Sequence, residues 1–412
     1  MAAVDRRMMF IGATPPPYGG IASHFVDLLE ILNKEGKENF FFYDPSKSGS
    51  PTSRDGMKLG DKPNPYLTVL NPFFILYFLF NLHKFLQIFF TIKKISKSKH
   101  KIVPENFPFY FLYKLINCLQ LIKKHHINSI SAYHTFPEAL YPYMIKKYFR
   151  PDMNYTVTVF GELQANTIDI EACGEIYKLA LQNADMLMAS SNYCAKGVEV
   201  LGLDAAKVRV VPYGINIEHF KRKTEYKLSE RKHTLLLVGH INKRMGLECL
   251  VKALSILAPK FPFLKVAMVG KDHGYLKEFL GLVSSAQLVD RVTILQDVKF
   301  DLLPEFYNSS YIYVNPMNTR LPCMGLAMKE AMAAELPVIA SNTGGIPEAV
   351  VDGVTGLVYQ TDNHVELARC IEKLLEAPDL ARSFGMAGRE RAKEIFDREK
   401  STMRIINMLS LL

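Results

Sequence analysis

The strongest constraint on the fold of this chain is the segment 315–356. It has the pattern of a buried strand ending at Asn315, a loop, a helix that starts near Gly325, and a second apolar strand at 337–340. Strand, helix and strand in this order are typical of a parallel sheet with crossover helices. Backbone amides and the dipole at the start of a helix bind anionic phosphate. We therefore expect a phosphate site at Gly325, Leu326 and Ala327.

Glu330 lies more than one turn into the same expected helix. From there it could reach over the helix edge and accept hydrogen bonds from sugar hydroxyls. The alternative is a solvated helix residue, because charged side chains lie mostly on exposed faces. The periodicity of the segment leaves both alternatives open.

Composition indicates a globular α/β protein with room for two domains. The 412 residues are 49% hydrophobic and 22% charged, with a formal net charge of +9 that suits anionic partners. No nucleic-acid motif accompanies this charge, so nucleic acid is not expected as a partner. The six cysteines form no CxxC pair, which predicts neither a metal site nor a disulfide framework. Residues 1–7 lack a signal-peptide layout, and we expect a reduced, cytoplasmic compartment.

Short apolar segments alternate with helical patterns along the whole chain, which predicts two doubly wound units. We expect strands at 8–13, 40–43, 127–133, 154–160, 184–191 and 208–212, then at 233–239, 264–270, 292–295, 312–315 and 337–340. A charged stretch at 221–232 predicts the domain boundary. The expected domains are 1–220 and 233–395, followed by a C-terminal helix at 396–412.

Polar residues follow several of these strands, where open α/β sheets bind their ligands. His134 comes directly after the strand at 127–133, and Glu162 follows the strand at 154–160. Near the N-terminus, Gly19 and Gly20 lie between a strand and a helical pattern, and glycines there let the backbone approach a phosphate. Each of these residues also has a purely structural alternative, as a polar loop residue or a tight turn.

The segment 71–101 is the most unusual part of the sequence. It has an apolar body interrupted by Asn81, His83, Lys84 and Gln87, and it ends in a lysine cluster. The interruptions argue against a membrane span. A hydrophobic helix with a basic end favours binding to an anionic membrane surface. The alternative is an internal helix whose aromatic residues pack on the sheet.

The segment at 322–350 resembles the donor-binding core of the GT-B glycosyltransferases of the retaining family 4. The family pattern EGFGLxxxEAMA-x-G-xPVIAS-xx-GG-xPE is matched at Gly325, Leu326, Glu330, Ala331, Met332, Pro337 to Ser341, Gly344, Gly345, Pro347 and Glu348. PYGGI at 17–21 and VPYGINIEHF at 211–220 resemble two further family segments. The resemblance implies two Rossmann-like domains that face each other across a cleft, with the nucleotide in the C-terminal domain.

The sequence departs from the family pattern at positions that carry charge. Pro322 stands where the family has the first glutamate of its pair, the one that contacts the donor sugar. In VGHINKRMG, which corresponds to VGRLxxEKG, His240 and Met245 replace an arginine and a lysine that neutralise the leaving diphosphate. Lys243 and Arg244 lie beside these positions. Arg244 could turn inward, the site could be weakened, or both charges could simply be solvated.

The resemblance implies a hexosyltransferase that moves a sugar from a nucleotide-diphosphate donor to an acceptor hydroxyl, with retention and without a cofactor or metal. Glu330 would hold the ribose, His134 would face the sugar, and Gly19 and Gly20 the diphosphate or acceptor. The expected acceptor is a glycan or lipid-linked sugar in cell-envelope synthesis, with the protein cytoplasmic and peripheral on the membrane. The alternatives are a catalytically degenerate binding subunit and a sugar-nucleotide epimerase of related fold.

Overall fold

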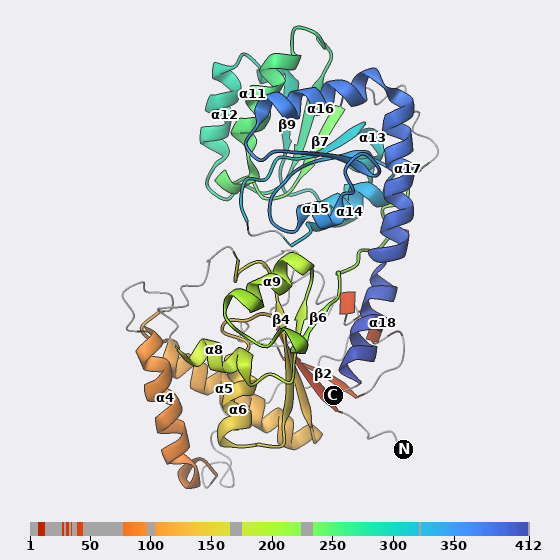
Figure 1. Cartoon of the computed structure of the whole chain (residues 1–412). Helices are drawn as coiled ribbons and strands as arrows, with labels where there is room; N and C mark the ends of the chain where they lie inside the picture. The colour runs from red at the N-terminus through yellow and green to blue at the C-terminus, as the bar shows by residue number, and fades with distance from the viewer. Residues whose placement is uncertain are drawn as a thin grey trace. The chain divides into compact units, whose positions relative to one another are not determined.

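A computed structural model describes residues 7–12, 27–28, 30–32, 34, 39–43, 77–96, 104–164, 175–223, 234–320 and 323–410. The chain divides into two compact units, which we describe separately (Figure 1). Unit 1 comprises Met1–Ser190, Cys194–Val211 and Ile405–Leu412, and unit 2 comprises Ser191–Tyr193 and Pro212–Arg404. Part of the expected linker at 221–232 lies outside the described residues.

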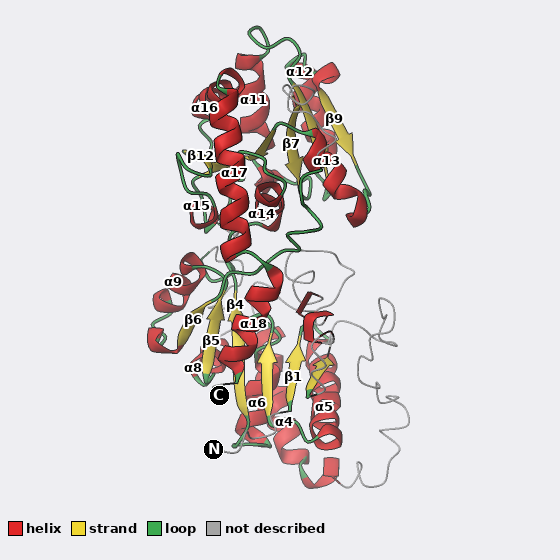
Figure 2. Cartoon of the chain, turned by 90° about the vertical axis from the view of Figure 1, so that its right-hand side faces the viewer, coloured by secondary structure: helices red, strands yellow, loops and turns green. Residues whose placement is uncertain are grey.

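Unit 1 is built on a parallel sheet with the strand order β2-β1-β3-β4-β5-β6 (Figure 2). Its strands are β1 (Met8–Ile11), β2 (Phe40–Tyr43), β3 (Ser129–Ala132), β4 (Asn154–Val159), β5 (Met186–Ala189) and β6 (Val208–Val210). Its helices are α4 (Leu82–Ser96), α5 (Phe107–His125), α6 (Leu140–Tyr148), α8 (Glu175–Gln182) and α9 (Asn192–Val200), the last of which begins with two unit 2 residues. The chain moves outward from β1 to β2 and returns on the other side of β1 with β3. The topological switch point of unit 1 therefore lies between β1 and β3.

Unit 2 is built on a second parallel sheet with the strand order β12-β11-β10-β7-β8-β9. Its strands are β7 (Thr234–Val238), β8 (Lys265–Val269), β9 (Val292–Leu295), β10 (Ile312–Asn315), β11 (Val338–Ser341) and β12 (Gly356–Tyr359). Its helices are α11 (Leu247–Leu257), α12 (Leu276–Ser285), α13 (Leu303–Ser309), α14 (Leu326–Ala333), α15 (Ile346–Ala349), α16 (His364–Glu376) and α17 (Pro378–Ile395); α18 (Arg398–Leu409) begins in unit 2 and ends in unit 1. Here the switch point lies between β7 and β10.

Helices cover both faces of the unit 2 sheet, and the strand residues alternate accordingly. Leu235 and Leu237 of β7 belong to one hydrophobic core, which includes residues of α11, α12 and α16. Leu236, between them, belongs to a second core with residues of α13, α14 and α15. Because successive side chains of a strand point to opposite faces, a sheet buried on both sides needs an apolar run such as that of β7.

The prediction of two doubly wound parallel sheets is confirmed. The sequence analysis missed β12, a strand of four residues that directly follows a turn. The C-terminal helical region was expected as a helix at 396–412, whereas α17 already begins at Pro378 and is followed by α18. Small residues such as Ala381 and Gly385 form the buried face at the start of α17, so the segment lacks a strong apolar period. Among the helices that the structure describes, none has the length and hydropathy of a membrane-spanning segment.

Candidate functional site

The candidate site lies at the carboxyl edge of the unit 2 sheet, at its switch point. The loops after β7 and β10 meet there, because the backbone N–H of Asn318 donates a 3.1 Å hydrogen bond to the carbonyl oxygen of Arg244. Gly246 has a φ of +69°, and a Cβ added to it would lie 1.8 Å from the carbonyl oxygen of Pro316. Only glycine allows this close approach in a left-handed conformation. Open α/β sheets bind ligands at such a switch point.

The loop after β7 ends in a 3-10 turn, η2 (Lys243–Met245), that presents two cations to solvent. The Asn242 side chain caps the turn by accepting a 2.9 Å hydrogen bond from the N–H of Arg244. Met245 is buried, while Lys243 and Arg244 are exposed. Lys243 Nζ lies 3.2 Å from a carboxylate oxygen of Glu278 on α12. Arg244 does not turn into the protein.

His240 lies on the same loop, immediately after β7. Its ring is exposed and lies 4.0 Å, between centroids, from the ring of His273 on the loop after β8. No motif surrounds His273, so it was not predicted from the sequence. Its position next to His240 follows from the pairing of β7 with β8. Within the described residues, no three His, Cys, Asp or Glu side chains gather into a metal-binding group.

Gly325 is the N-cap of α14, with a φ of +63° and no side-chain capping bond. The amides of Leu326 and Ala327 open the helix, and both residues are half-buried. A phosphate site at this first turn stays a prediction, which rests on the affinity of helix N-termini for anions. Pro322 lies outside the described residues.

Glu330 is buried, with 8% of its surface exposed, so the alternative of a solvated helix residue is wrong. The Tyr307 hydroxyl, on α13, donates a 2.6 Å hydrogen bond to Oε2 of Glu330. Burial and the neighbouring Glu330 carboxylate raise the pKa of Tyr307 well above its ordinary value, so this hydroxyl keeps its proton. Tyr307 therefore fixes one oxygen of Glu330, a contact that no pattern around Tyr307 predicts.

Lys329, next to Glu330, is a second buried charge on α14. Its Nζ donates a 2.7 Å hydrogen bond to the carbonyl oxygen of Tyr213 and lies 4.6 Å from the centroid of the Phe396 ring. Lys329 thereby ties α14 to the segment that enters unit 2 and to the end of α17. Burial of a lysine is tolerated where its ammonium group has such partners.

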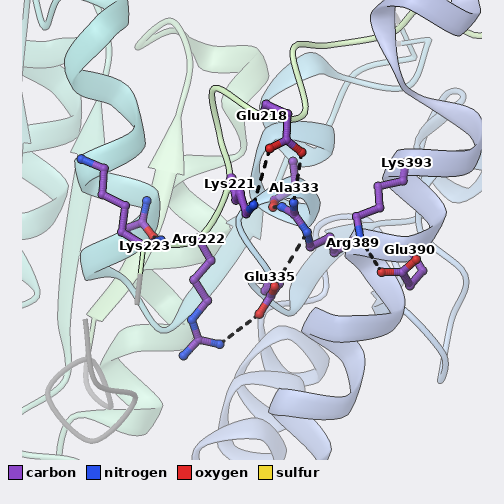
Figure 3. Close-up of polar contacts among 10 residues, drawn as sticks. Glu218, Lys221, Arg222, Lys223, Ala333, Glu335, Arg389, Glu390 and Lys393 are labelled. Carbon is purple, nitrogen blue, oxygen red and sulfur yellow. Dashed lines mark hydrogen bonds and ion pairs between the residues drawn. The ribbon is translucent and has the colours of Figure 1, made fainter. Parts of the chain in front are cut away.

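Arg389 of α17 holds the same entering segment from another side. It is 6% exposed and donates to the carbonyl oxygen of Ala333. Its guanidinium nitrogens lie 3.5 Å from a Glu218 oxygen and 3.8 Å from a Glu335 oxygen. Figure 3 shows Arg389 between these two carboxylates, with Arg222 on the other oxygen of Glu335 at 3.2 Å. The network fixes the end of α14, and with it the frame of the candidate site.

In unit 1, His134 lies after β3, which borders the switch point, and Glu162 lies after β4, the next strand of the sheet. His134 Nδ1 is 2.9 Å from the carbonyl oxygen of Phe136, and its ring centroid is 6.0 Å from that of Phe160. Glu162 is 3% exposed, and its Oε1 accepts a 2.8 Å hydrogen bond from the Thr135 hydroxyl. This hydrogen bond orients the Glu162 carboxylate.

Gly19 and Gly20 lie outside the described residues. Within unit 2 the structure brings together the loop of His240, Lys243 and Arg244 and the loop that leads to Gly325. His134 and Glu162 belong to unit 1 and are described only there.

Two parallel six-stranded α/β units are the architecture of the GT-B glycosyltransferases. A family model described as Glycosyltransferase Family 4 matches residues 18–219, and one described as Glycosyl transferases group 1 matches residues 219–391. Together they account for most of the chain, which belongs to glycosyltransferase family 4.

Solved structures share the fold. The HepE protein of Anabaena, solved in complex with UDP, has a TM-score of 0.73 and 17% identity over 98% of this chain and all of that chain. Sucrose-phosphate synthase from Thermosynechococcus elongatus has a TM-score of 0.73 and 20% identity, with 98% of each chain covered. At these identities the likeness concerns the fold.

Among curated proteins, the chain is similar to a GDP-mannose-dependent alpha-(1-6)-phosphatidylinositol monomannoside mannosyltransferase of Mycobacterium tuberculosis. The two are 30% identical over 199 residues, which cover 45% of this chain and 51% of the relative. The chain thus spans about half the length of the curated relatives that it matches first.

Proposed function

We propose that the protein transfers a hexosyl unit from a nucleoside-diphosphate sugar to the hydroxyl of a glycan or lipid-linked acceptor. The observation that carries this proposal is the junction of loops in unit 2. There, the loop that carries the exposed cations Lys243 and Arg244 is hydrogen-bonded to the loop that leads to α14. The first-turn amides of α14 receive no side-chain capping bond from Gly325. A diphosphate needs such positive charge and oriented N–H groups. The half-length match to a mannosyltransferase and the UDP-bound neighbour support a nucleotide sugar as donor.

In the proposed reaction, the acceptor oxygen forms a bond to the anomeric carbon with retention of configuration. The bond from that carbon to the phosphate oxygen breaks, and the nucleoside diphosphate leaves with the electron pair. The acceptor proton passes to the leaving diphosphate. Cations near the departing phosphate lower the barrier because they act where negative charge develops. Glu330, oriented by Tyr307, would hold the ribose, and His134 would face the sugar. No metal or cofactor is part of this scheme.

Nucleotide-sugar binding tests the donor site. In a thermal-shift panel of UDP, GDP, ADP and their sugar conjugates, a ligand at one hundred times its Kd stabilises the native state by about 2.7 kcal/mol. We expect one base to stabilise the wild type and a Lys243→Ala, Arg244→Ala double variant to lose most of that shift. Lys252→Ala is the matched control, because Lys252 is exposed and paired with a glutamate on the same unit. Absence of a shift with every nucleotide would refute the donor site.

A non-catalytic binding subunit is the second candidate function. The observation that favours it is Met245, which lies in the hydrophobic core and supplies no charge to the site. Nucleotide-sugar binding without release of nucleoside diphosphate, in the presence of lipid-linked and glycan acceptors, would establish this alternative. Acceptor-dependent release of the diphosphate would exclude it.

We further propose that the protein binds its acceptor at an anionic membrane surface, which it contacts through α4 and α5. One face of α4 is buried through Phe85, Ile88 and Ile92. The other face exposes Leu86 and Phe90, at 46% and 57% of their surfaces. The apolar surface continues over the preceding turn and onto α5, with Tyr77, Leu79, Phe80, Leu82, Phe109 and Tyr110 exposed. A helix that is apolar on both faces needs a second apolar environment.

The charge of this region suits anionic lipid. Glu105 is the sole acidic residue of the sequence between 71 and 125. The same stretch carries Lys84, Lys93, Lys94, Lys97, Lys99, Lys101, Lys123 and Lys124, besides Lys114, which is buried. Each lysine near an anionic surface adds about 1 kcal/mol of attraction.

Vesicle flotation tests this surface. We expect the protein to float with vesicles that contain phosphatidylglycerol and not with pure phosphatidylcholine. Replacing the exposed pair in Leu86→Ser, Phe90→Ser removes about 2 kcal/mol of apolar transfer, or roughly a thirty-fold loss of partitioning. The matched control is Ile256→Ser, Phe263→Ser, whose residues are as exposed but lie on unit 2. Equal flotation of both double variants would refute the α4 surface.

A further inference from the structure

The pair formed by His240 and His273 is built into the carboxyl edge of the unit 2 sheet. The two exposed imidazole rings have centroids 4.0 Å apart and planes tilted by 42°. They come from the loops after two neighbouring strands, β7 and β8. β7 is also the strand that borders the switch point. The pair therefore lies beside the cations of η2, on the edge where ligands of such sheets bind.

Backbone hydrogen bonds fix these two loops against each other. The N–H of Ile241 donates to the carbonyl oxygen of Lys271 at 2.9 Å, and the N–H of His273 donates back to that of Ile241 at 3.0 Å. A Cβ on Gly270 would lie 1.7 Å from the Gly239 carbonyl oxygen, so glycine is required for this contact. The backbone positions of His240 and His273 are therefore fixed relative to each other by the fold.

Two nearby carboxylates, Asp272 and Glu278, have hydrogen-bond or ion-pair partners of their own. Oδ1 of Asp272 accepts hydrogen bonds from the N–H groups of Gly274, Tyr275 and Leu276 at 2.9–3.0 Å. These bonds, and to a smaller extent the charge of His273, lower the pKa of Asp272, which remains ionised beside the start of α12. Glu278 is paired with Lys243. The charged and titratable groups on the surrounding elements are Lys243, Arg244, Glu248, Lys271, Asp272, Tyr275, Glu278 and Asp297.

We propose that His240 and His273 together bind the diphosphate of the donor as a pair of imidazolium groups. The inference rests on the proposed function and adds a residue and a pH dependence to it. Two cationic rings at 4.0 Å repel each other, so the doubly protonated pair is unfavourable without an anion. A diphosphate over the pair removes this repulsion and accepts hydrogen bonds from both rings. Donor binding is therefore coupled to proton uptake.

The sign of the pH dependence follows from this coupling. The bound anion favours the protonated form of the imidazoles over the neutral form. Affinity is then greatest at low pH and is lost as pH rises through the range of 5 to 8 in which imidazoles titrate. Each coupled proton contributes at most a tenfold change in affinity per pH unit.

Isothermal titration calorimetry with GDP-mannose and UDP-glucose at pH 6, 7 and 8 tests the proposal. Each phosphate of such donors has one ester bond and shares the anhydride bond with the other, so each keeps a single negative charge over this range and a pH effect comes from the protein. For the donor that binds, we expect a loss of about tenfold or more between pH 6 and pH 8. Buffers with different ionisation enthalpies will report net proton uptake at pH 7.

Three variants separate the pair from a general effect of pH. His273→Gln should bind several-fold more weakly at pH 6 and show a shallower pH profile. His240→Arg carries a permanent charge and should flatten the profile while retaining affinity at pH 8. His364→Gln, on α16 of the same unit, is the control and should follow the wild type.

A pH-independent affinity in the wild type, or a profile of His273→Gln that matches it, would overturn the inference and leave the donor site standing. Absence of donor binding at every pH would overturn the proposed function, and the inference with it.

Discussion

Removal of the Tyr307 hydroxyl tests whether Glu330 is held in place from within the core. Tyr307 is fully buried, and its hydroxyl lies 2.6 Å from Oε2 of Glu330 and 3.3 Å from the carbonyl oxygen of Ala327. Tyr307→Phe deletes one oxygen and keeps the ring contacts with Phe220 and Tyr313, whose centroids lie at 5.5 and 6.2 Å. The change therefore isolates the hydrogen bond.

The expected cost follows from the charge and burial of the acceptor. A hydrogen bond to an ionised group contributes about 1.5–3 kcal/mol, and a buried carboxylate that loses its donor is not resolvated by the small space left. We therefore expect Tyr307→Phe to lower the unfolding free energy of unit 2 by about 2 kcal/mol. For a unit of about 200 residues this lowers the Tm by roughly 4–8 °C. A freed Glu330 should also bind the ribose less well, by about fivefold for 1 kcal/mol.

Differential scanning calorimetry and urea titration measure the stability, and calorimetric titration measures the nucleotide affinity. Tyr311→Phe is the matched control, because Tyr311 is also buried but its hydroxyl lies 3.5 Å from a neutral carbonyl, that of Leu374. We expect it to cost less than about 1 kcal/mol. A double-mutant cycle with Glu330→Gln should give a coupling of at least about 1 kcal/mol. Equal melting temperatures for the two tyrosine variants would refute the reasoning.

Three further perturbations test the frame and the chemistry. Gly246→Ala places a methyl group against the carbonyl oxygen of Pro316 at a φ of +69°, so it should cost about 3 kcal/mol or more and abolish nucleotide binding; Gly274→Ala, at a φ of +84° but in open space, should cost only about 1 kcal/mol by urea titration. Arg389→Leu should lower unfolding free energy by about 3 kcal/mol, whereas Lys393→Leu, on the exposed face of α17, should have little effect. Transferase activity, measured as acceptor-dependent nucleotide release, should persist in EDTA; its loss and recovery with a divalent cation would contradict the metal-free scheme.

The strands could be predicted from the sequence where an apolar run ends abruptly. The bounds of β2, β9 and β10 coincide with the predicted segments. β12 was missed because it opens with Gly356 directly after a turn, and its place depends on pairing with β11. The early start of α17 was missed because Gly385 packs against the carbonyl oxygen of Glu335. A close helix contact made by small residues leaves no apolar period in the sequence.

The candidate site was predictable in position but not in its contacts. Because His134 and His240 directly follow strands, their places at the sheet edges can be read from the sequence. Tyr307 and His273, in contrast, come from segments without a motif. They meet Glu330 and His240 only through the placement of α13 and the adjacency of β7 and β8. Sheet order and helix placement are set by the packing of the whole unit, so no local pattern encodes these two contacts.

The burial of Met245 accounts for where the charge of this loop lies. A 3-10 turn has three residues per turn, so the side chains of η2 point in three directions about 120° apart. Met245 packs into the core next to Gly239, where an added Cβ would lie 3.0 Å from its terminal methyl carbon. With that direction fixed inward, Lys243 and Arg244 must both point to solvent. The fixed positive charge of this loop therefore lies on exposed side chains, at the edge of the sheet where we propose that the anionic donor binds.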